Sequence, residues 1–294
     1  MMKIGCGSVV FREYDIDRTL DAIYRAGYRY FETQATNPWC NHVVIDRDDP
    51  VRFAEKAKSH GFLGITSLWT NEGALIPAKD SCLDTIRRTI EWAAAAGIPV
   101  VDFGDGHKPA DMSEADAFAR FTERLLLLLE HAEKSGVTLA LEPHGTFSLT
   151  ADGLARILAI SDSRNFGINY DCANIHRAAY METKDGKAVW RSLGGGASEA
   201  KILRQVVHRV VHFHAKDLDA AGKCVALGTG CVDVAGCIGV LREAGYGGVV
   251  SLETEGGMPF EDSCVLAGPA MLISRRSSDA FSGSTTAAPS RRAR

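Results

Sequence analysis

One phrase recurs along the chain and constrains its fold more than any other feature. A helix-like segment ends in a small residue or a histidine, glycine follows, and an apolar run comes directly after it. The glycine supplies the left-handed cap of the helix, and the β-rich run indicates a short buried strand. The phrase occurs in "RAGYRYFET" (25–33), "SHGFLGITS" (59–67), "AAGIPVVDF" (95–103), "KSGVTLALE" (134–142) and "EAGYGGVVSLE" (243–253).

Strands alternate with helices along almost the whole chain. Three further strands lack the glycine signal and bring the total to eight; they span 3–8, 166–171 and 210–216. Helical patterns are predicted near 16–26, 50–60, 80–96, 113–135, 150–161, 198–208, 232–244 and 261–273. This alternation predicts an α/β fold, a parallel eight-stranded (β/α)8 TIM barrel. A doubly wound open sheet would alternate similarly, but no G-x-G-x-x-G follows the first strand and no P-loop is present.

The C-terminal residues differ in composition from the predicted barrel. We expect one TIM-barrel domain over 1–273, although Gly268 and Pro269 fall inside its last predicted helix. Residues 274–294 are rich in Ser, Ala and Arg without periodicity, which predicts a disordered tail.

Charge and cysteine usage exclude several classes of protein. The formal net charge of −4 argues against a nucleic-acid partner, which would need a clustered basic excess. The apolar run at 125–129 is far too short for a membrane span, and the first residues lack the apolar stretch of a signal peptide. Eight scattered cysteines without a C-x-x-C pair predict reduced thiols and a cytoplasmic protein, rather than a disulfide or zinc framework.

Four consecutive predicted strands end in a residue that can bind a metal ion. They are Glu142 in "LALEPHG", Asp171 in "NYDCAN", His214 in "HFHAKD" and Glu253 in "SLETEGG". In a TIM barrel such strand ends converge on one mouth. Buried carboxylates are costly unless paired or metal-bound, and three carboxylates with one imidazole suit Mn²⁺, Mg²⁺ or Co²⁺, with Zn²⁺ as a further option. Taken singly, each acid could equally be a loop residue or helix cap, so spacing alone leaves both readings open.

The motifs around these residues resemble those of a known superfamily. The H-x-K-D at 214–217, the G-x-G-x-x-D at 228–233 and the Gly-Tyr-Gly-Gly run before Glu253 are similar to the xylose-isomerase-like TIM-barrel superfamily. That group contains sugar phosphate isomerases and epimerases, ketose 3-epimerases, hydroxypyruvate isomerases and inosose dehydratases. The resemblance extends from residue 3 to about 273 and specifies the superfamily better than the reaction.

The resemblance implies a metal site and a reaction. Glu142, Asp171, His214 and Glu253 would hold one divalent metal ion, Mn²⁺ first, with Co²⁺, Mg²⁺ or Zn²⁺ as alternatives. Glu142 and Glu253 would also be the catalytic pair that exchanges protons with a sugar through a metal-bound enediolate. The expected function is therefore a metal-dependent isomerase or epimerase.

Three departures weigh against a free-sugar ketose 3-epimerase. Those enzymes usually have histidine where this chain has Asn174, arginine at Ala220 and glutamate at Ser148. A metal-dependent lyase or dehydratase on a keto-sugar or keto-inositol, acting by β-elimination and including 3-keto-glycoside cleavage, therefore stays as an alternative. A non-catalytic sugar-binding barrel is another. A DNA-repair endonuclease of the same superfamily is disfavoured by the acidic balance.

Polar and aromatic side chains near these strand ends predict a sugar-binding cavity. The segment 172–201 is long enough for a lid or binding loop, although a surface hairpin turning at 183–187 fits it as well. On the strand itself, His212 either supports His214 or is a core histidine, and Asp217 is expected to orient neighbours or cap the next turn. No residue decides whether the protein forms a homo-oligomer. The predicted substrate-binding residues are His144, Asn174, His176, Lys216, Trp39 and Trp190.

Overall fold

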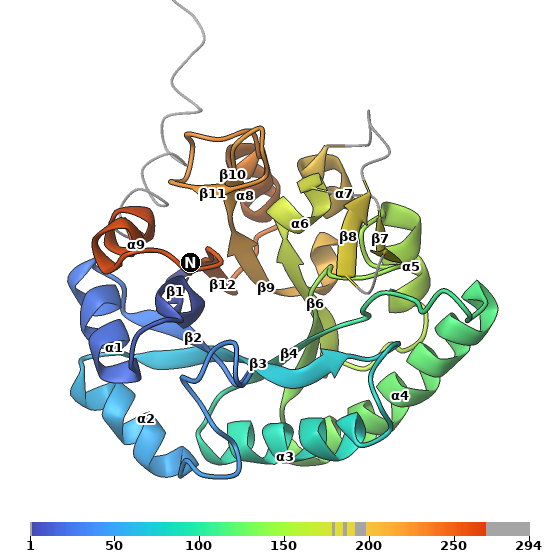
Figure 1. The fold of residues 1–294 in the computed structure, drawn as a ribbon, viewed down its shortest axis with the longest axis horizontal. Coiled ribbons are helices and arrows are strands. Elements are labelled where there is room, and N and C mark those ends of the chain that lie inside the picture. The colour runs from blue at the N-terminus through green and yellow to red at the C-terminus, as the bar shows by residue number, and fades with distance from the viewer. Residues whose placement is uncertain (1, 178–179, 185–186, 192–197, 269–294) are drawn as a thin grey trace, which may run out of the picture.

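The computed structural model describes residues 2–177, 180–184, 187–191 and 198–268. Eight parallel strands close into a barrel in the order β1-β12-β9-β6-β5-β4-β3-β2, with helices outside it (Figure 1). The structure confirms the predicted TIM barrel and excludes the open doubly wound sheet, because β1 pairs with β12 as well as with β2. The barrel strands are β1 (Lys3–Gly7), β2 (Tyr30–Gln34), β3 (Gly64–Ala74), β4 (Val100–Gly104), β5 (Thr138–Leu141), β6 (Phe166–Asp171), β9 (Val210–Ala215) and β12 (Val249–Leu252).

Each predicted helix is present on the outside of the barrel. The predicted helix 261–273 is too long, because it ends at Ala267, where Gly268 turns the backbone to a φ of 50° and a proline comes next. The predicted tail 274–294 lies outside the described residues. The helices are α1 (Ile16–Arg25), α2 (Pro50–Ser59), α3 (Cys82–Ala95), α4 (Glu114–Ser135), α5 (Ala151–Leu158), α7 (Glu199–Val206), α8 (Val234–Glu243) and α9 (Phe260–Ala267), with short 3-10 turns η1 (Ser8–Phe11) and η2 (Val207–Arg209).

The recurring glycine has the conformation that the sequence predicted for it. In all five phrases its φ is positive, between 68° and 98°. Gly136 shows the reason: its N–H caps α4 by donating to Ala132 and Glu133, and the chain then turns directly into β5. In these five phrases, the left-handed glycine therefore ends the helix and allows the chain to turn into the next strand.

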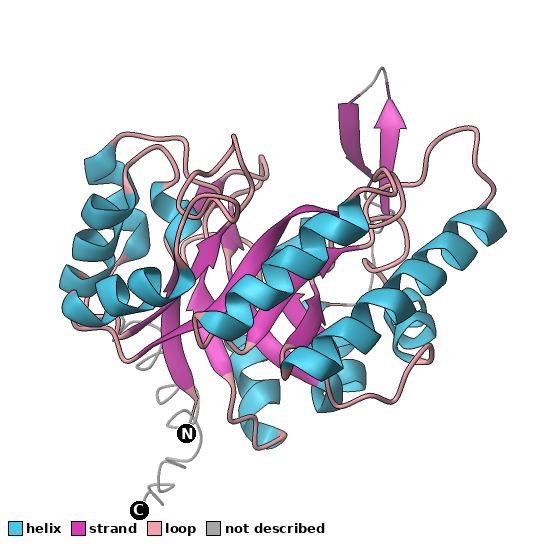
Figure 2. Cartoon of the chain, turned by 90° about the horizontal axis from the view of Figure 1, so that it is seen from below, coloured by secondary structure: helices cyan, strands magenta, loops and turns pink. Residues whose placement is uncertain are grey.

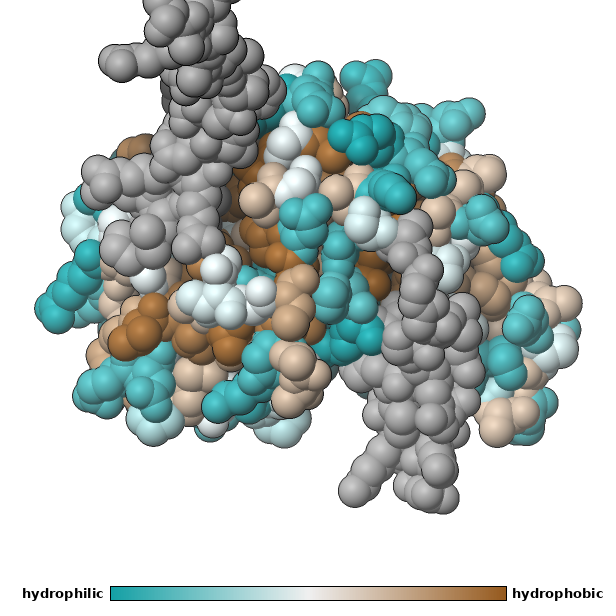
Figure 3. Space-filling view, turned by 90° about the horizontal axis from the view of Figure 1, so that it is seen from above, coloured by the Kyte–Doolittle hydropathy of each residue, from teal (hydrophilic) through white to brown (hydrophobic). Residues whose placement is uncertain are grey.

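Helix faces follow the burial that an α/β barrel requires. In the leucine run of α4, Leu125, Leu128 and Leu129 are buried, while Leu126 and Leu127 face solvent. On the face drawn in Figure 3, hydrophilic residues are prominent around the periphery and apolar residues lie mainly between them. No helix in the described part of the chain is both long enough and apolar enough to cross a membrane. All eight cysteines are free, and six of them are buried.

The segment after β6 contains structure that the sequence patterns did not resolve. A short helix, α6 (Cys172–Arg177), follows β6 at once, and two antiparallel strands, β7 (Tyr180–Lys184) and β8 (Lys187–Arg191), form a hairpin. Figure 2 shows this hairpin projecting from the body of the protein. The hairpin interpretation of the segment is thus confirmed, with the turn itself outside the described residues. A second small pair, β10 (Asp217–Leu218) and β11 (Cys224–Val225), comes after β9.

Candidate active site

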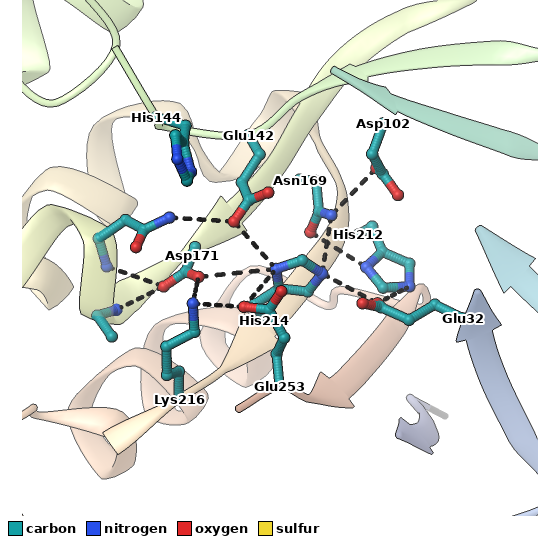
Figure 4. A network of polar contacts seen from close by, with 12 residues as sticks. Glu32, Asp102, Glu142, His144, Asn169, Asp171, His212, His214, Lys216 and Glu253 are labelled. Carbon is teal, nitrogen blue, oxygen red and sulfur yellow. Dashed lines mark hydrogen bonds and ion pairs between the residues drawn. The ribbon is translucent and has the colours of Figure 1, made fainter. Parts of the chain in front are cut away.

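The four predicted metal ligands meet at the carboxyl ends of four adjacent strands. Asp171 is the last residue of β6, His214 lies in β9, and Glu142 and Glu253 directly follow β5 and β12. The backbone N–H groups of the two glutamates are still bonded to neighbouring strands, Glu142 to Phe103 and Glu253 to Ala215. Strand pairing therefore fixes their positions. One ligand atom of each of the four residues lies within 4.8 Å of all the others, and all four residues are buried (Figure 4).

The spacing within this cluster fits one bound cation. Nδ1 of His214 lies 3.4 Å from Oε1 of Glu142, 3.5 Å from Oε2 of Glu253 and 3.7 Å from Oδ2 of Asp171. Two atoms that each bind one small divalent ion at about 2.1 Å are about 3 to 3.5 Å apart. Nδ1 of His214, Oδ2 of Asp171 and Oε2 of Glu253 are buried atoms without a well-formed hydrogen bond among the described residues. The residues present therefore fit a divalent metal ion.

Crowded acids and buried cations dominate the electrostatics of the cluster. Burial and then the charge of Glu253 raise the pKa of Glu142 to about 8. Burial acts the same way on Asp171, but Lys216 and His214 outweigh it and hold the pKa of Asp171 well below its usual value. Nζ of Lys216 lies 2.8 Å from Oδ2 of Asp171 and 2.5 Å from Oε2 of Glu253, in ion-pair range of both. Lys216, predicted as a substrate-binding residue, thus also pairs with two of the four acid–histidine cluster residues.

The residues after Asp171 fold back onto the cluster. Oδ1 of Asp171 accepts hydrogen bonds from the backbone N–H groups of Ala173 and Asn174, at 2.8 and 2.9 Å, and so starts α6. The turn brings the amide of Asn174 to Glu142, where Nδ2 donates to Oε1 at 3.0 Å. Its Oδ1 is buried without a hydrogen-bond partner among the described residues. The Asp-x-x-Asn spacing therefore has a local structural role, because one helical turn links two of the four cluster residues, Asp171 and Glu142.

A cavity of about 410 Å³ opens above the cluster. Its size suits a small-molecule ligand. Trp39 is 48% exposed on its wall, with the guanidinium of Arg12 stacked 4.6 Å from its ring. His144 also lines it, against the ring of Trp69. The cavity-lining residues are Gln34, Thr36, Trp39, Trp69, Glu142, His144, Arg177, Lys216, Glu253 and Glu255.

Three predicted substrate-binding residues are absent from the cavity lining or not described. Asn174 is buried and its side chain donates to Glu142 instead. His176 is not among the cavity-lining residues and pairs with Glu199. Trp190 lies in β8, and its side chain is outside the described structure. Conversely, the sequence patterns did not single out Trp69 or Glu255 as cavity residues. Trp69 sits in a strand that runs further than predicted, and Glu255 follows Glu253 by two residues, a spacing that could have indicated it.

Glu32 is the largest omission of the sequence analysis. It lies inside β2, is 2% exposed, and its Oε2 is 2.9 Å from Nε2 of His214. Burial raises the pKa of Glu32, but the facing His214 and His212 outweigh this and lower it overall. Only its position in the middle of a predicted strand, directly after Phe31, could have indicated it. His212, one pleat deeper than His214, is fully buried and bonded to Asn169 and Thr66.

The G-x-G-x-x-D motif organises the loop after β9. Asp217 accepts hydrogen bonds from the backbone N–H groups of Gly228, Gly230 and Val232, as its predicted orienting role requires. At Gly230 a Cβ would come within 2.3 Å of the carbonyl oxygen of Leu218, so only glycine fits. The aspartate at the end of the motif caps α8. The motif therefore orders the loop between β9 and α8 and contributes no residue to the described acid–histidine cluster.

Together, the closed parallel barrel and the acid–histidine cluster at its mouth define a class of (β/α)8 proteins, and sequence comparison assigns the family. The family described as "Xylose isomerase-like TIM barrel" matches residues 20–271. The chain belongs to this family, which confirms the resemblance seen in its motifs. An uncharacterized protein of Methanocaldococcus jannaschii is 25% identical over 267 residues, covering 86% of this chain and 84% of that protein.

Solved structures of similar fold carry several reactions. A D-tagatose 3-epimerase-like protein superposes with a TM-score of 0.74 at 18% identity, over 96% of this chain and 100% of that one. A 3-keto-D-glucoside 4-epimerase from E. coli gives 0.72 at 16% identity, over 94% and 100%. A probable 3-DHS dehydratase from Bacillus anthracis gives 0.69 at 17% identity, over 90% and 97%. At these identities the likeness establishes the fold, and the reactions belong to those proteins.

Proposed function

We propose that this protein is a divalent-metal-dependent isomerase or epimerase that moves a proton on a sugar or sugar derivative. The observation that supports it is the convergence of Nδ1 of His214 with oxygens of Glu142, Asp171 and Glu253 at the floor of an open cavity. We propose Mn²⁺ as the ion, with Co²⁺, Mg²⁺ or Zn²⁺ as alternatives. A divalent cation held there would polarise a carbonyl and its adjacent hydroxyl, which makes the neighbouring C–H acidic.

In this proposal Glu142 and Glu253 are the catalytic pair. One removes the proton from carbon and the other returns one, which requires two carboxylates that reach the same ligand from different strands. Both line the cavity. Asn174 fixes Oε1 of Glu142 by donation, and the ammonium of Lys216 fixes Oε2 of Glu253 by charge. The two glutamates are therefore held in place by neutral and cationic partners respectively.

The cavity lining supports a polyol ligand. The indole rings of Trp39 and Trp69 offer flat apolar surface for the C–H face of a sugar ring, and Gln34, Thr36 and His144 offer hydrogen-bonding atoms. Such a mixture of apolar faces and few polar groups is typical of small-molecule sites. We assign the ligand to sugars and sugar derivatives on this basis.

A metal-dependent lyase or dehydratase acting on a keto-sugar or keto-inositol is the second candidate. Two positions where ketose 3-epimerases usually have a histidine and a glutamate are Asn174 and Ser148 here, and the hydroxyl of Ser148 is fully buried against Asp105. A dehydratase is also among the structures of similar fold. β-Elimination begins with the same proton removal and then expels a leaving group, so the same cluster serves both reactions.

Metal content is the first test of the proposal. We expect about one divalent ion per chain in the wild-type protein after loading with Mn²⁺, and loss of that ion in Glu142→Gln and His214→Ala. The exposed Glu123→Gln variant on α4 is the control for removing one carboxylate. Absence of bound metal from the loaded wild type would contradict both metal-dependent mechanisms and favour a sugar-binding barrel.

Product analysis then separates the two reactions. The loaded protein is incubated in D₂O with a panel of keto-sugars and 3-keto-glycosides and followed by mass spectrometry and NMR. An isomerase or epimerase incorporates one deuterium and keeps the carbon skeleton and its substituents. A lyase yields a product that has lost water or an aglycone. Tight binding without either change would contradict an enzymatic role.

A further inference from the structure

Glu32 and the three proposed carboxylate ligands lie on opposite sides of the imidazole ring of His214. Nδ1 of the ring faces the oxygens of Glu142, Asp171 and Glu253, whereas Nε2 faces Oε2 of Glu32 at 2.9 Å (Figure 4). Glu32 is not part of the cavity lining and is nearly inaccessible to solvent. Its carboxylate therefore contacts a metal ligand without being placed to contact a substrate.

This arrangement determines where the proton of His214 lies. A carboxylate oxygen accepts hydrogen bonds, so the close Nε2–Oε2 contact requires the hydrogen on Nε2. A neutral imidazole protonated at Nε2 has its lone pair on Nδ1, which is the atom aimed at the three carboxylates. Only that tautomer can bind a cation in the cluster. The same hydrogen bond holds the ring in its plane and increases the basicity of Nδ1.

A buried polar network surrounds the contact between Glu32 and the imidazole ring of His214. His212 places Nε2 3.7 Å from the same Oε2 of Glu32 and contacts Oδ1 of Asn169 through Nδ1 at 3.1 Å. Nδ2 of Asn169 donates to Oδ1 of Asp102 at 3.0 Å. It also lies 3.0 Å from Nε2 of His214, but with the hydrogen on Nε2 both atoms are donors, so this second contact is not a hydrogen bond. These residues project inward from β9, β6 and β4, so three strands of the barrel brace the contact from below.

We propose that Glu32 is a positioning residue of the metal centre, which selects the Nε2-protonated tautomer of His214 and so presents Nδ1 to the ion. This inference rests on the proposed metal-dependent function. Glu32, His212 and His214 are also close enough to hold an ion of their own. That arrangement would need Nε2 of His214 without its hydrogen, so the two possibilities exclude each other and differ in which ring nitrogen of His214 binds the ion.

The first experiment compares metal binding in three proteins. Wild type, Glu32→Gln and Asp102→Asn are titrated with Co²⁺ while heat and visible absorption are recorded, and urea unfolding of the metal-free proteins reports their stability. Asp102 is the matched control, since it is an equally buried acid of the same network that contacts Asn169 instead of His214. We expect one ion per wild-type chain. In Glu32→Gln, affinity should fall about 10- to 100-fold with a shifted Co²⁺ spectrum, whereas Asp102→Asn should stay within about threefold of wild type.

Several outcomes would overturn the inference, and each is distinct from failure of the proposed function. Equal losses of affinity in both variants, or none in Glu32→Gln, would show that Glu32 is merely part of the core. Two ions per wild-type chain, one of them absent in Glu32→Gln, would make Glu32 a ligand. No ion in the wild type would remove the metal site itself, and the inference with it.

A measurement on the wild type alone covers the case in which Glu32→Gln does not fold. Two-bond ¹H–¹⁵N correlation spectra of the Zn²⁺-loaded protein report which ring nitrogen of each histidine carries hydrogen. The signals of His214 are identified by their absence in His214→Gln. Protonation at Nε2 with Nδ1 bound to the ion is the expected result. The opposite tautomer would contradict the proposal whatever the variants do.

Discussion

At the scale of single residues, Lys216 sets the charge balance of the candidate metal site. Its ammonium is buried and pairs with Asp171 and Glu253, with Glu255 3.9 Å away. Burial lowers the pKa of Lys216, but the surrounding carboxylates outweigh it and raise the pKa well above its usual value. The ammonium therefore neutralises part of the acid cluster that a metal ion would also neutralise. The two cations should oppose each other.

Replacing Lys216 with methionine should reveal this opposition. In the presence of EDTA, Lys216→Met should lower the free energy of unfolding by about 3 kcal/mol, because it leaves buried carboxylates uncompensated. With saturating Mn²⁺ the deficit should shrink by at least about 1.4 kcal/mol, the equivalent of tenfold tighter metal binding. Urea unfolding with and without metal measures both quantities.

The exposed Lys58→Met variant on α2 is the control for loss of one lysine. If Lys216→Met lowers the free energy of unfolding by the same amount with and without Mn²⁺, the ammonium of Lys216 does not repel the bound ion.

The sequence could predict which single residues lie together where each residue stands at a strand end. Glu142, Asp171, His214 and Glu253 could be assigned to one place because parallel strands of a barrel deliver their carboxyl ends to one mouth. Glu32 could not, since it lies within β2 and its partner His214 is distant in the chain. A contact between two residues that are so distant in the sequence produces no local sequence pattern.

At the scale of elements, a buried carboxylate holds the loop that comes after the ligand Glu142. Asp105, just after β4, accepts hydrogen bonds from the backbone N–H groups of Phe147 and Ser148, at 2.6 and 3.1 Å, and from the Ser148 hydroxyl at 2.6 Å. The same hydroxyl accepts from the N–H of His144. The loop at the cavity edge is therefore fixed by one acid. Burial raises the pKa of Asp105 to about 6, although these hydrogen bonds lower it.

This raised pKa predicts a specific pH dependence of stability. The folded pKa of Asp105, about 6, exceeds the value of about 3.9 expected in the unfolded chain. Because the folded state binds this proton more tightly, proton binding stabilises the fold fully below about pH 4. This stabilisation is lost as the pH rises through 6. The stability of wild type relative to Asp105→Asn should fall by up to about 3 kcal/mol between pH 4 and 7, measured by urea unfolding.

The exposed Asp111→Asn variant is the control for removing one carboxylate. A wild-type advantage over Asp105→Asn that stays constant across this pH range would mean that Asp105 is ionised in the folded protein throughout.

Alanine substitutions at two glycines, one just after a helix and one inside a helix, should change the stability of the protein in opposite directions. Gly136 has a φ of 68° and Gly239 lies within α8, and an added Cβ meets nothing within 4 Å at either position. Gly136→Ala should destabilise the protein by about 1 kcal/mol, because alanine resists the left-handed conformation. Gly239→Ala should stabilise it by about 0.5 to 1 kcal/mol, because alanine favours the helix. Thermal unfolding compares both with wild type; equal signs would contradict the conformational explanation.

Elements were predictable where the glycine phrase repeats and not where the chain departs from it. Five of the eight barrel strands follow from one repeated local signal, and the other three, which lack the glycine, complete the alternation with the helices. The short helix α6 and the hairpin β7–β8 interrupt that alternation, so the sequence patterns left 172–201 as one loop with two interpretations. The end of α9 was misjudged because the apolar pattern continues past Gly268, whereas the backbone conformation there stops the helix.

At the scale of the whole molecule, the barrel and the metal cluster should stabilise each other. The cluster forms only when β5, β6, β9 and β12 are assembled side by side, so the proposed ion would bind the folded chain and hardly the unfolded one. The free energy of metal binding would then add to the free energy of folding. A bound cation would also relieve the repulsion between the buried carboxylates.

This coupling gives a quantitative prediction. Above its dissociation constant, each tenfold increase in free Mn²⁺ should raise the free energy of unfolding by about 1.4 kcal/mol if one ion binds per chain, and by about twice that if two bind. The slope from urea unfolding at buffered metal concentrations therefore counts the ions without any assumption about the substrate. His214→Ala should give a flat line. A flat line for the wild type would show that the convergence of acids at this mouth serves a purpose other than holding metal.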